Sequence, residues 1–406
     1  MTPNSLIIGF VPLLDCATLV AAVEQGFMTA EGLQVTLVRE TSWANIRDRI
    51  MVGHFDAAHM LGPMTVASSL GIGHLTTPMV APIALGLGGN AITVSNTLWQ
   101  QMTQQGARLG ADPATQGRAL RQVVAQRAQD QQPPLTFGMV YPFSCHNYEL
   151  RYWLAGSGID PDHDVQLVVI PPPLLVDALR EGQVDGFCVG EPWNSLAVEV
   201  GVGTIATTTQ AIWRLSPEKV LGCRADWAER HPEQLAGLIR AIYKAAQWCE
   251  QPEHHAELAT LLAQPRYVGA PTDVLRRTLG CRLRYASGAE LVHVPEFFVP
   301  ARHTATFPWA SHALWFYSQM ARWGQTAFST DAMHLARATY RPDLYRTALL
   351  NTGVQPPMTD FKTERTTDSS FALTASNDAL SFTPEGFFDG KVFEPTAVEE
   401  YIKSFG

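Results

Sequence analysis

Two short segments of the sequence place side chains of catalytic type next to one another. Cys145 directly precedes His146, and Glu191 precedes Pro192 and Trp193. A Cys/His pair needs adjacency in space, and neighbours in sequence rarely face each other across a turn. A glycosidase needs a second carboxylate at a defined separation, and the sequence nominates none. We therefore expect no enzymatic activity from either segment, and we interpret residues 191–194 as a structural turn at the mouth of a cleft.

The sequence offers no short motif for a metal. The adjacent residues His254 and His255 lack the i, i+4 spacing of a helical zinc site. No two cysteines form the closely spaced pair that zinc and redox sites use. We therefore expect no metal, no cofactor and reduced thiols at Cys16, Cys145, Cys188, Cys223, Cys249 and Cys281.

The composition is that of a globular protein. A chain of 406 residues predicts two or three domains, and 46% hydrophobic residues can form a large core. The net charge of -9, without a basic cluster, argues against direct nucleic-acid binding. No apolar stretch is long enough to span a membrane. The first ten residues lack the features of a signal peptide, so we expect a cytoplasmic location.

The elements that must position any site begin with a β-α-β pattern. Residues 6–11 and 33–39 are apolar runs typical of strands, and residues 17–26 between them have helical spacing. A second helix is expected at residues 44–52, followed by a strand at 57–60. This order favours a parallel sheet covered by helices.

A G-x-x-D turn occurs twice between a helix and a strand. Gly53 and Asp56 form the first copy, and Gly182 and Asp185 form the second, 129 residues later. Each copy alone is a common turn. Together they predict two similar α/β lobes. We assign residues 1–94 and 208–406 to lobe one, whose C-terminal tail packs across it, and residues 95–207 to lobe two, with a ligand in the cleft between them.

Six segments resemble the nitrate and bicarbonate solute-binding proteins of ABC importers. They are residues 8–15 (IGFVPLLD), 41–48 (TSWANIRD), 89–93 (GNAIT), the region around His146 (FSCHNYELRYWLAGSGIDP), 189–194 (VGEPWN) and 216–227 (SPEKVLGCRADW). The resemblance covers nearly the whole chain and implies a two-lobed class II periplasmic-binding-protein-like α/β fold. Without a recognisable signal sequence, the chain is most similar to the cytoplasmic nitrate/nitrite sensor of this group.

The resemblance implies that nitrate or nitrite contacts Trp43, Asn90, His146 and Lys219. Nitrate is a planar monoanion with three acceptor oxygens, so its pocket needs donors, a positive charge and a flat apolar wall. Lys219 offers the charge, His146 and Asn90 offer N–H donors, and Trp43 offers an indole N–H or a wall. Singly, each is more often a packing, turn, capping or surface residue than a ligand contact.

Two departures from the family bear on the ligand. Asn90 stands where transporter-type relatives carry Gln, and one methylene less requires closer lobes or a bridging water. The turn before His146, residues 143–145, lacks the small glycine-rich residues of the family. Lys219 stands where the bicarbonate branch carries an acidic residue that recruits calcium. We therefore expect nitrate or nitrite without a metal.

Three functions remain open at this point. The first is a cytoplasmic nitrate/nitrite sensor that holds an RNA-binding antiterminator of the ANTAR type and releases it on binding the anion, without touching RNA itself. The second is the solute-binding component of an ABC importer. The third is an enzyme on the same fold, such as a pyrimidine-precursor synthase of thiamine metabolism, although the closely spaced cysteines expected there are absent.

Overall fold

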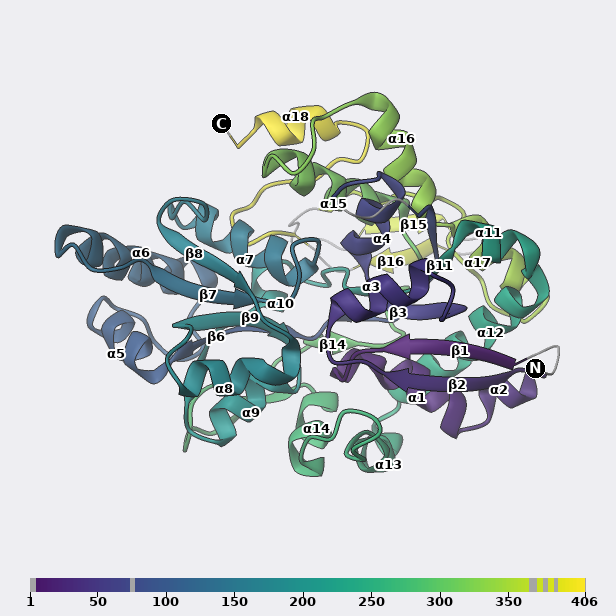
Figure 1. Ribbon diagram of the computed structural model, residues 1–406, viewed down its shortest axis with the longest axis horizontal. Coiled ribbons are helices and arrows are strands. Elements are labelled where there is room, and N and C mark those ends of the chain that lie inside the picture. The colour runs from purple at the N-terminus through teal and green to yellow at the C-terminus, as the bar shows by residue number, and fades with distance from the viewer. Residues whose placement is uncertain (1–4, 74–76, 365–370, 375–378, 383–385, 406) are drawn as a thin grey trace.

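A computed structural model describes residues 5–73, 77–364, 371–374, 379–382 and 386–405. Two five-stranded sheets with helices on their faces form two lobes side by side (Figure 1). The first sheet has the strand order β2-β1-β3-β11-β4. Its strands are β1 (Ser5–Phe10), β2 (Gln34–Arg39), β3 (Ala57–Leu61), β4 (Met79–Ala84) and β11 (Lys219–Arg224).

The first lobe begins with the predicted β-α-β unit. β1 is parallel to β2 and β3, whereas β11 runs antiparallel between β3 and β4. Ile8 and Phe10 of β1 are fully buried, as the apolar run predicts. The helices up to the first crossing are α1 (Ala17–Glu24), α2 (Phe27–Ala30), α3 (Trp43–Met51) and α4 (Gly62–Ser69).

The second lobe repeats this arrangement with the order β8-β7-β9-β6-β10. Its strands are β6 (Asn90–Ser95), β7 (Leu135–Met139), β8 (Val165–Val169), β9 (Gly186–Gly190) and β10 (Gly203–Thr208). Its helices are α5 (Asn96–Gln104), α6 (Pro113–Gln129), α7 (Cys145–Gly156), α8 (Leu175–Arg180), α9 (Trp193–Glu199) and α10 (Thr209–Ile212).

The pairing of β6 corrects the predicted boundary between residues 94 and 95. We had placed residues 90–94 in lobe one, but β6 pairs with β9 and β10 in the second sheet. The chain therefore crosses between the sheets before Asn90. The other residue limits of the lobes stay a prediction.

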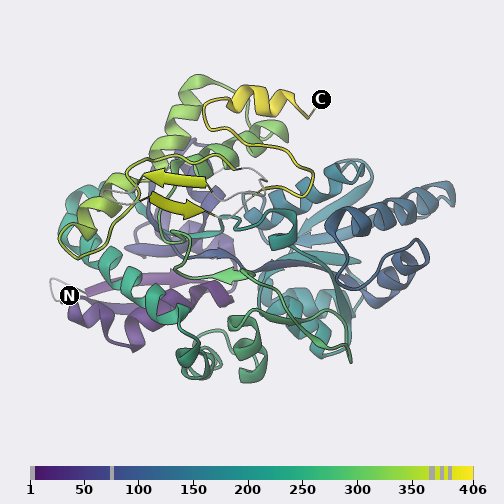
Figure 2. The same cartoon turned by 180° about the vertical axis from the view of Figure 1, so that it is seen from behind.

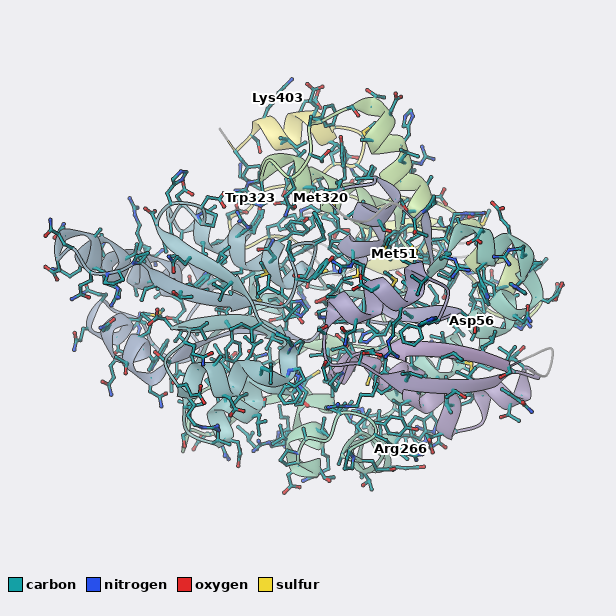
Figure 3. All side chains as sticks on the ribbon, in the orientation of Figure 1. Met51, Asp56, Arg266, Met320, Trp323 and Lys403 are labelled. Atoms are coloured by element: carbon teal, nitrogen blue, oxygen red, sulfur yellow. The ribbon has the colours of Figure 1, made fainter. Side chains whose placement is uncertain are left out.

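The repeated turn performs the same task in both lobes. Asp56 accepts a hydrogen bond from the backbone N–H of Ile7 in β1, and Asp185 accepts one from Thr136 in β7. Both bonds are 2.8 Å long and span 49 residues of sequence. Gly53 and Gly182 have φ of 78° and 69°, which glycine adopts without steric cost. Asp56 is labelled at the first lobe's sheet in Figure 3.

The two crossings between the lobes lie against each other. β5 (Leu87–Gly88) in the first crossing forms a bridge to Pro217 in the second. The N–H of Gly88 donates to the carbonyl of Ser216 at 2.9 Å, and the N–H of Leu85 donates to the carbonyl of Lys219 at 2.9 Å. The two crossings therefore form one paired hinge. Asn90 follows the first crossing at the start of β6, and Glu218 ends the second crossing directly before β11.

The chain after β11 is mainly helical. Its elements are α11 (Ala225–Arg230), α12 (Pro232–Glu250), α13 (His255–Leu262), α14 (Thr272–Leu279), β12 (Arg282–Arg284), β13 (Leu291–His293), β14 (Phe298–Val299), α15 (Ala310–Arg322), α16 (Thr330–Thr339), α17 (Pro342–Leu349), β15 (Phe371–Thr374), β16 (Ala379–Phe382) and α18 (Val398–Lys403). Seen from behind, β15 and β16 are the two yellow antiparallel strands that lie side by side (Figure 2). Among the described residues, no helix is both long and apolar enough to cross a membrane.

An aromatic seam joins the C-terminal segment to both lobes. α15 and α16 pack on α4 of the first lobe. Tyr152 of α7 in the second lobe packs against Trp315 of α15 and against Phe387 and Phe388. The hydroxyl of Tyr152 donates to Asp389 at 3.0 Å. The segment after residue 386 therefore lies across the boundary between the lobes.

Candidate ligand-binding site

The structure brings the four predicted contact residues together at the hinge. Asn90 is the first residue of β6, and Lys219 is the first residue of β11. Trp43 begins α3, and His146 is the second residue of α7. All four side chains are at most 1% exposed. Their role in binding a ligand stays a prediction, but their expected proximity is observed.

Serine caps fix the two helix starts that face the site. The Ser42 hydroxyl accepts from the N–H of Asn45, which starts α3 at Trp43. The Ser144 hydroxyl accepts from the N–H of Asn147, which starts α7 at Cys145. Serine is favoured at such positions because its oxygen satisfies an N–H that the helix leaves without a partner. Local sequence therefore holds Trp43 and His146 in place.

Lys219 is the cation of the cluster and is already paired. Its Nζ lies 2.7 Å from Oδ2 of Asp15 and 2.9 Å from Oε1 of Glu218. Burial alone would lower the pKa of Lys219, but these two carboxylates raise it above its usual value. The ammonium also lies 5.6 Å from the centre of the Trp43 ring. Lys219 therefore stays charged although it is buried.

Asn90 and His146 point to the same carboxylate. Nδ2 of Asn90 donates to Oε1 of Glu218 at 2.8 Å and to Oε2 of Glu149 at 3.1 Å. Nε2 of His146 lies 3.3 Å from Oε1 of Glu218. Burial lowers the pKa of His146 to about 4, so its ring is neutral near pH 7 and carries one N–H.

Asp15 contacts Lys219, and His59 packs against Trp43. The N–H of Val11 donates to Nδ1 of His59, so Nε2 carries the proton, and this nitrogen lies 3.0 Å from Oδ1 of Asp15. The rings of Trp43 and His59 meet edge to face with centres 5.2 Å apart. Asp15 thus holds Lys219 with one oxygen and His59 with the other.

Sequence reasoning missed four members of this cluster, namely Asp15, His59, Glu149 and Glu218. Asp15 closes the first family-like segment, and Glu218 directly precedes Lys219. Glu149 follows His146 by three residues, which places both on one face of α7 and could have been noticed. Burial and the neighbouring Glu218 raise the pKa of Glu149 to about 8.

Several buried polar atoms of the cluster have no hydrogen-bond partner. They include Nε1 of Trp43, Nδ1 of His146, Oδ1 of Asn90, Oε1 of Glu149 and Oε2 of Glu218. Buried polar groups are almost always bonded in folded proteins, and exceptions concentrate where a ligand or water binds. This concentration makes the cluster the candidate ligand-binding site.

The two segments of catalytic type have structural partners. The thiol of Cys145 donates to the carbonyl of Glu218 at 3.5 Å, and burial raises its pKa well above the usual value, which disfavours a thiolate nucleophile. The carbonyl of Glu191 accepts from the N–H of Leu14, and the indole of Trp193 donates to the carbonyl of Pro12. Glu191 and Pro192 therefore form a turn against the first lobe, and the predicted turn ends earlier than expected because Trp193 and Asn194 begin α9.

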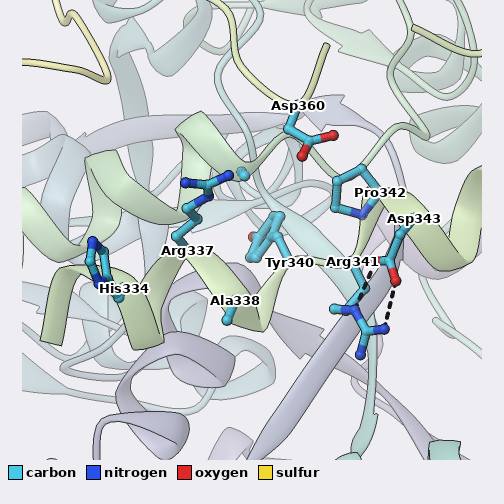
Figure 4. Close-up of a pocket in the computed structure, with 9 residues that line it drawn as sticks. His334, Arg337, Ala338, Tyr340, Arg341, Pro342, Asp343 and Asp360 are labelled. Carbon is cyan, nitrogen blue, oxygen red and sulfur yellow. Dashed lines mark hydrogen bonds and ion pairs between the residues drawn. The ribbon is translucent and has the colours of Figure 1, made fainter. Parts of the chain in front are cut away.

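A separate surface pocket lies on the C-terminal helices and shares no residue with this site. Figure 4 shows its lining residues between α16 and α17. Arg341 in this pocket is paired with Asp343 at 2.6 Å. In the ranges that the structure describes, no group of three or more His, Cys, Asp or Glu side chains is arranged to hold a metal ion.

Two sheet-centred lobes with a buried polar cluster at their hinge define the two-lobed periplasmic-binding-protein fold. Residues 1–263 match the NMT1-like family, and the chain belongs to this family. It superposes on the crystal structure of the periplasmic nitrate-binding protein NrtA from Synechocystis PCC 6803 with a TM-score of 0.86 and 28% identity, covering 99% of this chain and 98% of that one. The predicted fold is thereby confirmed.

Two kinds of relative are similar over nearly the whole chain. The nitrate/nitrite binding protein NrtA of Synechococcus elongatus is 32% identical over 97% of this chain and 84% of its own length. The nitrate import ATP-binding protein NrtC of Synechocystis is 36% identical over 99% of this chain but only 55% of its own length. The chain thus spans about half the length of the ATP-binding relatives that it matches. The predicted resemblance to nitrate-binding solute-binding proteins is confirmed, whereas the closer likeness to the cytoplasmic sensor stays a prediction.

Proposed function

We propose that this protein binds nitrate or nitrite at the hinge cluster, as the anion-binding component of an ABC importer. The observation that carries the proposal is the convergence of Lys219, Asn90, His146 and Trp43 from both lobes on one buried place. Of the two anion-binding functions, importer component and sensor, the relatives favour the importer component, because they are named as nitrate/nitrite binding and nitrate import proteins.

The chemistry of the donors suits a small planar anion. Lys219 supplies a fixed positive charge, because its pKa is raised. Asn90 and neutral His146 supply N–H donors that add no charge, and the indole N–H of Trp43 has no other partner. These donors come from both lobes, so a ligand that bonds all of them favours the closed arrangement.

Titration calorimetry with nitrate and nitrite tests the proposal. We expect binding of one or both anions in the presence of a calcium chelator, and Lys219→Glu should abolish it. Loss of a charge-assisted bond costs roughly 1.5–3 kcal/mol, and the new carboxylate adds repulsion. Lys244→Glu, at an exposed lysine paired with Glu31, is the matched control. Unchanged affinity in a folded Lys219→Glu variant would remove Lys219 from the site.

The sensor with an ANTAR-type antiterminator is the second candidate, and its cytoplasmic location stays a proposal too. The observation that supports it is the net charge of -9 without a basic cluster, which suits contact with a basic RNA-binding protein better than contact with RNA itself. Co-elution with an antiterminator of this type should then depend on nitrate or nitrite. Complex formation that ignores the anion, or no complex at all, would leave the importer role.

A further inference from the structure

One carboxylate oxygen meets three of the four predicted anion-binding donors. Oε1 of Glu218 lies 2.9 Å from Nζ of Lys219, 2.8 Å from Nδ2 of Asn90 and 3.3 Å from Nε2 of His146. No other acceptor in the described part of the chain is recorded within bonding reach of all three. The Glu218 side chain is itself 1% exposed.

Glu218 also connects the two lobes through these contacts. It ends the second crossing, directly before β11 of the first lobe. His146 belongs to α7 and Asn90 to β6, both in the second lobe. A carboxylate bonded to both sides of the hinge therefore makes the same cross-lobe contacts that we propose for the ligand.

We propose that Glu218 is an internal competitor that occupies the anion position and must give up these donors before nitrate or nitrite binds. The inference rests on the proposed function. A carboxylate and nitrate are both planar anions with equivalent oxygens, so the same donors suit either. Two anions cannot share one set of donors in a buried place, because their repulsion is weakly screened there.

The surrounding charges make this competition severe. Asp15 already holds the far side of Lys219, and Glu149 shares the amide of Asn90. His59 and His146 face the cluster from β3 and α7. The thiols of Cys145 and Cys188 and the hydroxyl of Tyr340 also lie within electrostatic range of Glu218 and are neutral, because burial raises their pKa well above the usual values. Three carboxyl groups thus surround one ammonium, and removing the Glu218 charge relieves the repulsion that an incoming anion would meet.

Replacing Glu218 tests the proposal directly. Glu218→Gln keeps the size of the side chain and removes its charge, whereas Glu218→Ala empties the position. Both variants should bind nitrate or nitrite more tightly than the unmodified protein, by about tenfold or more, since a charge-assisted competitor has been removed. Glu149→Gln is the matched control, because Glu149 contacts only one of the three donors, and its effect should be smaller.

Formate provides a second readout. As a free carboxylate, it should compete with nitrate more strongly in Glu218→Ala than in the unmodified protein, where it must first displace Glu218. Thermal unfolding shows whether each variant is folded and whether nitrate stabilises it more than the unmodified protein. Binding by the unmodified protein with equal or weaker binding by both Glu218 variants overturns this inference alone. No binding by any of the proteins overturns the proposed function as well.

Discussion

Asp15 and Lys219 form a buried ion pair, with 2.7 Å between Oδ2 and Nζ. Burial by itself would raise the pKa of Asp15, but Lys219 and His59 hold it well below its usual range. The pair therefore stays ionised inside the protein, and it joins the first turn after β1 to the strand that follows the second crossing. Every prediction for the site depends on this fixed charge.

Asp15→Asn should strongly destabilise the protein. Removing one partner of a buried ion pair typically costs about 3–5 kcal/mol, although Lys219 keeps Glu218 as a second partner. Because folding lowers the pKa of Asp15, its stabilising contribution is present above about pH 4 and is lost as the pH falls below that value. Urea unfolding should therefore show a large difference in unfolding free energy between the unmodified protein and Asp15→Asn at pH 7, and a smaller difference at pH 3. Asp48→Asn, in an exposed pair with Arg47, should change little.

Glu149→Gln should remove a pH-dependent cost. The pKa of Glu149 rises from 4.5 to about 8 on folding, so the folded chain keeps a proton that the unfolded chain has lost between these values. The Glu149 contribution to the unfolding free energy therefore falls as the pH rises from about 4.5 to about 8. Urea unfolding at pH 5, 7 and 9 should show that the unfolding free energy of the variant increases relative to that of the unmodified protein as the pH rises. Parallel profiles would contradict the prediction, and Glu257→Gln on the surface serves as the control.

The two repeated aspartates should differ in importance despite their equivalent positions. Asp185→Ala leaves the N–H of Thr136 without its carboxylate, at a cost of about 1–3 kcal/mol. Asp56→Ala should cost more, because Asp56 also accepts from the indole of Trp227 at 3.1 Å. Denaturant unfolding of both variants measures which one loses more unfolding free energy. Equal losses would mean that the Trp227 contact adds nothing.

Trp43→Phe should weaken anion binding while the protein stays folded. Phenylalanine keeps an aromatic wall but lacks the indole N–H, which is buried without a partner. Losing a hydrogen bond to a charged ligand should reduce affinity by about tenfold or more. Calorimetry with nitrate measures this change. Trp248→Phe, whose ring stacks on His254 outside the site, should leave affinity unaltered.

The sequence predicted the repeating elements better than the sheet to which each belongs. Apolar runs and the G-x-x-D turns indicated two α/β lobes, because each signal is local. Residues 90–94 were assigned to the wrong lobe, since only Gly89 separates β6 from β5 and nothing in these residues indicates which sheet they join. Pairing between strands far apart in the chain leaves no local mark.

In the site, too, local sequence signals predicted individual residues but not their long-range contacts. Family-like segments led to Trp43, Asn90, His146 and Lys219, which the structure brings together. They did not reveal that Asp15 and Glu218 take both sides of Lys219, because that depends on how the two crossings pair. Glu218 is visible in the sequence only as the neighbour of a lysine, and its contacts with Asn90 and His146 arise from the meeting of two lobes.

The aromatic seam between α7 and the C-terminal segment has a kinetic consequence. The helix that carries His146 at its start holds Tyr152 two turns later, among Trp315, Phe387 and Phe388. Moving this helix away from the first lobe requires separating those rings, in addition to breaking the hydrogen bonds of a bound ligand. The time for which a ligand stays bound is therefore governed in part by residues that never touch it, so residence time and equilibrium affinity can change independently.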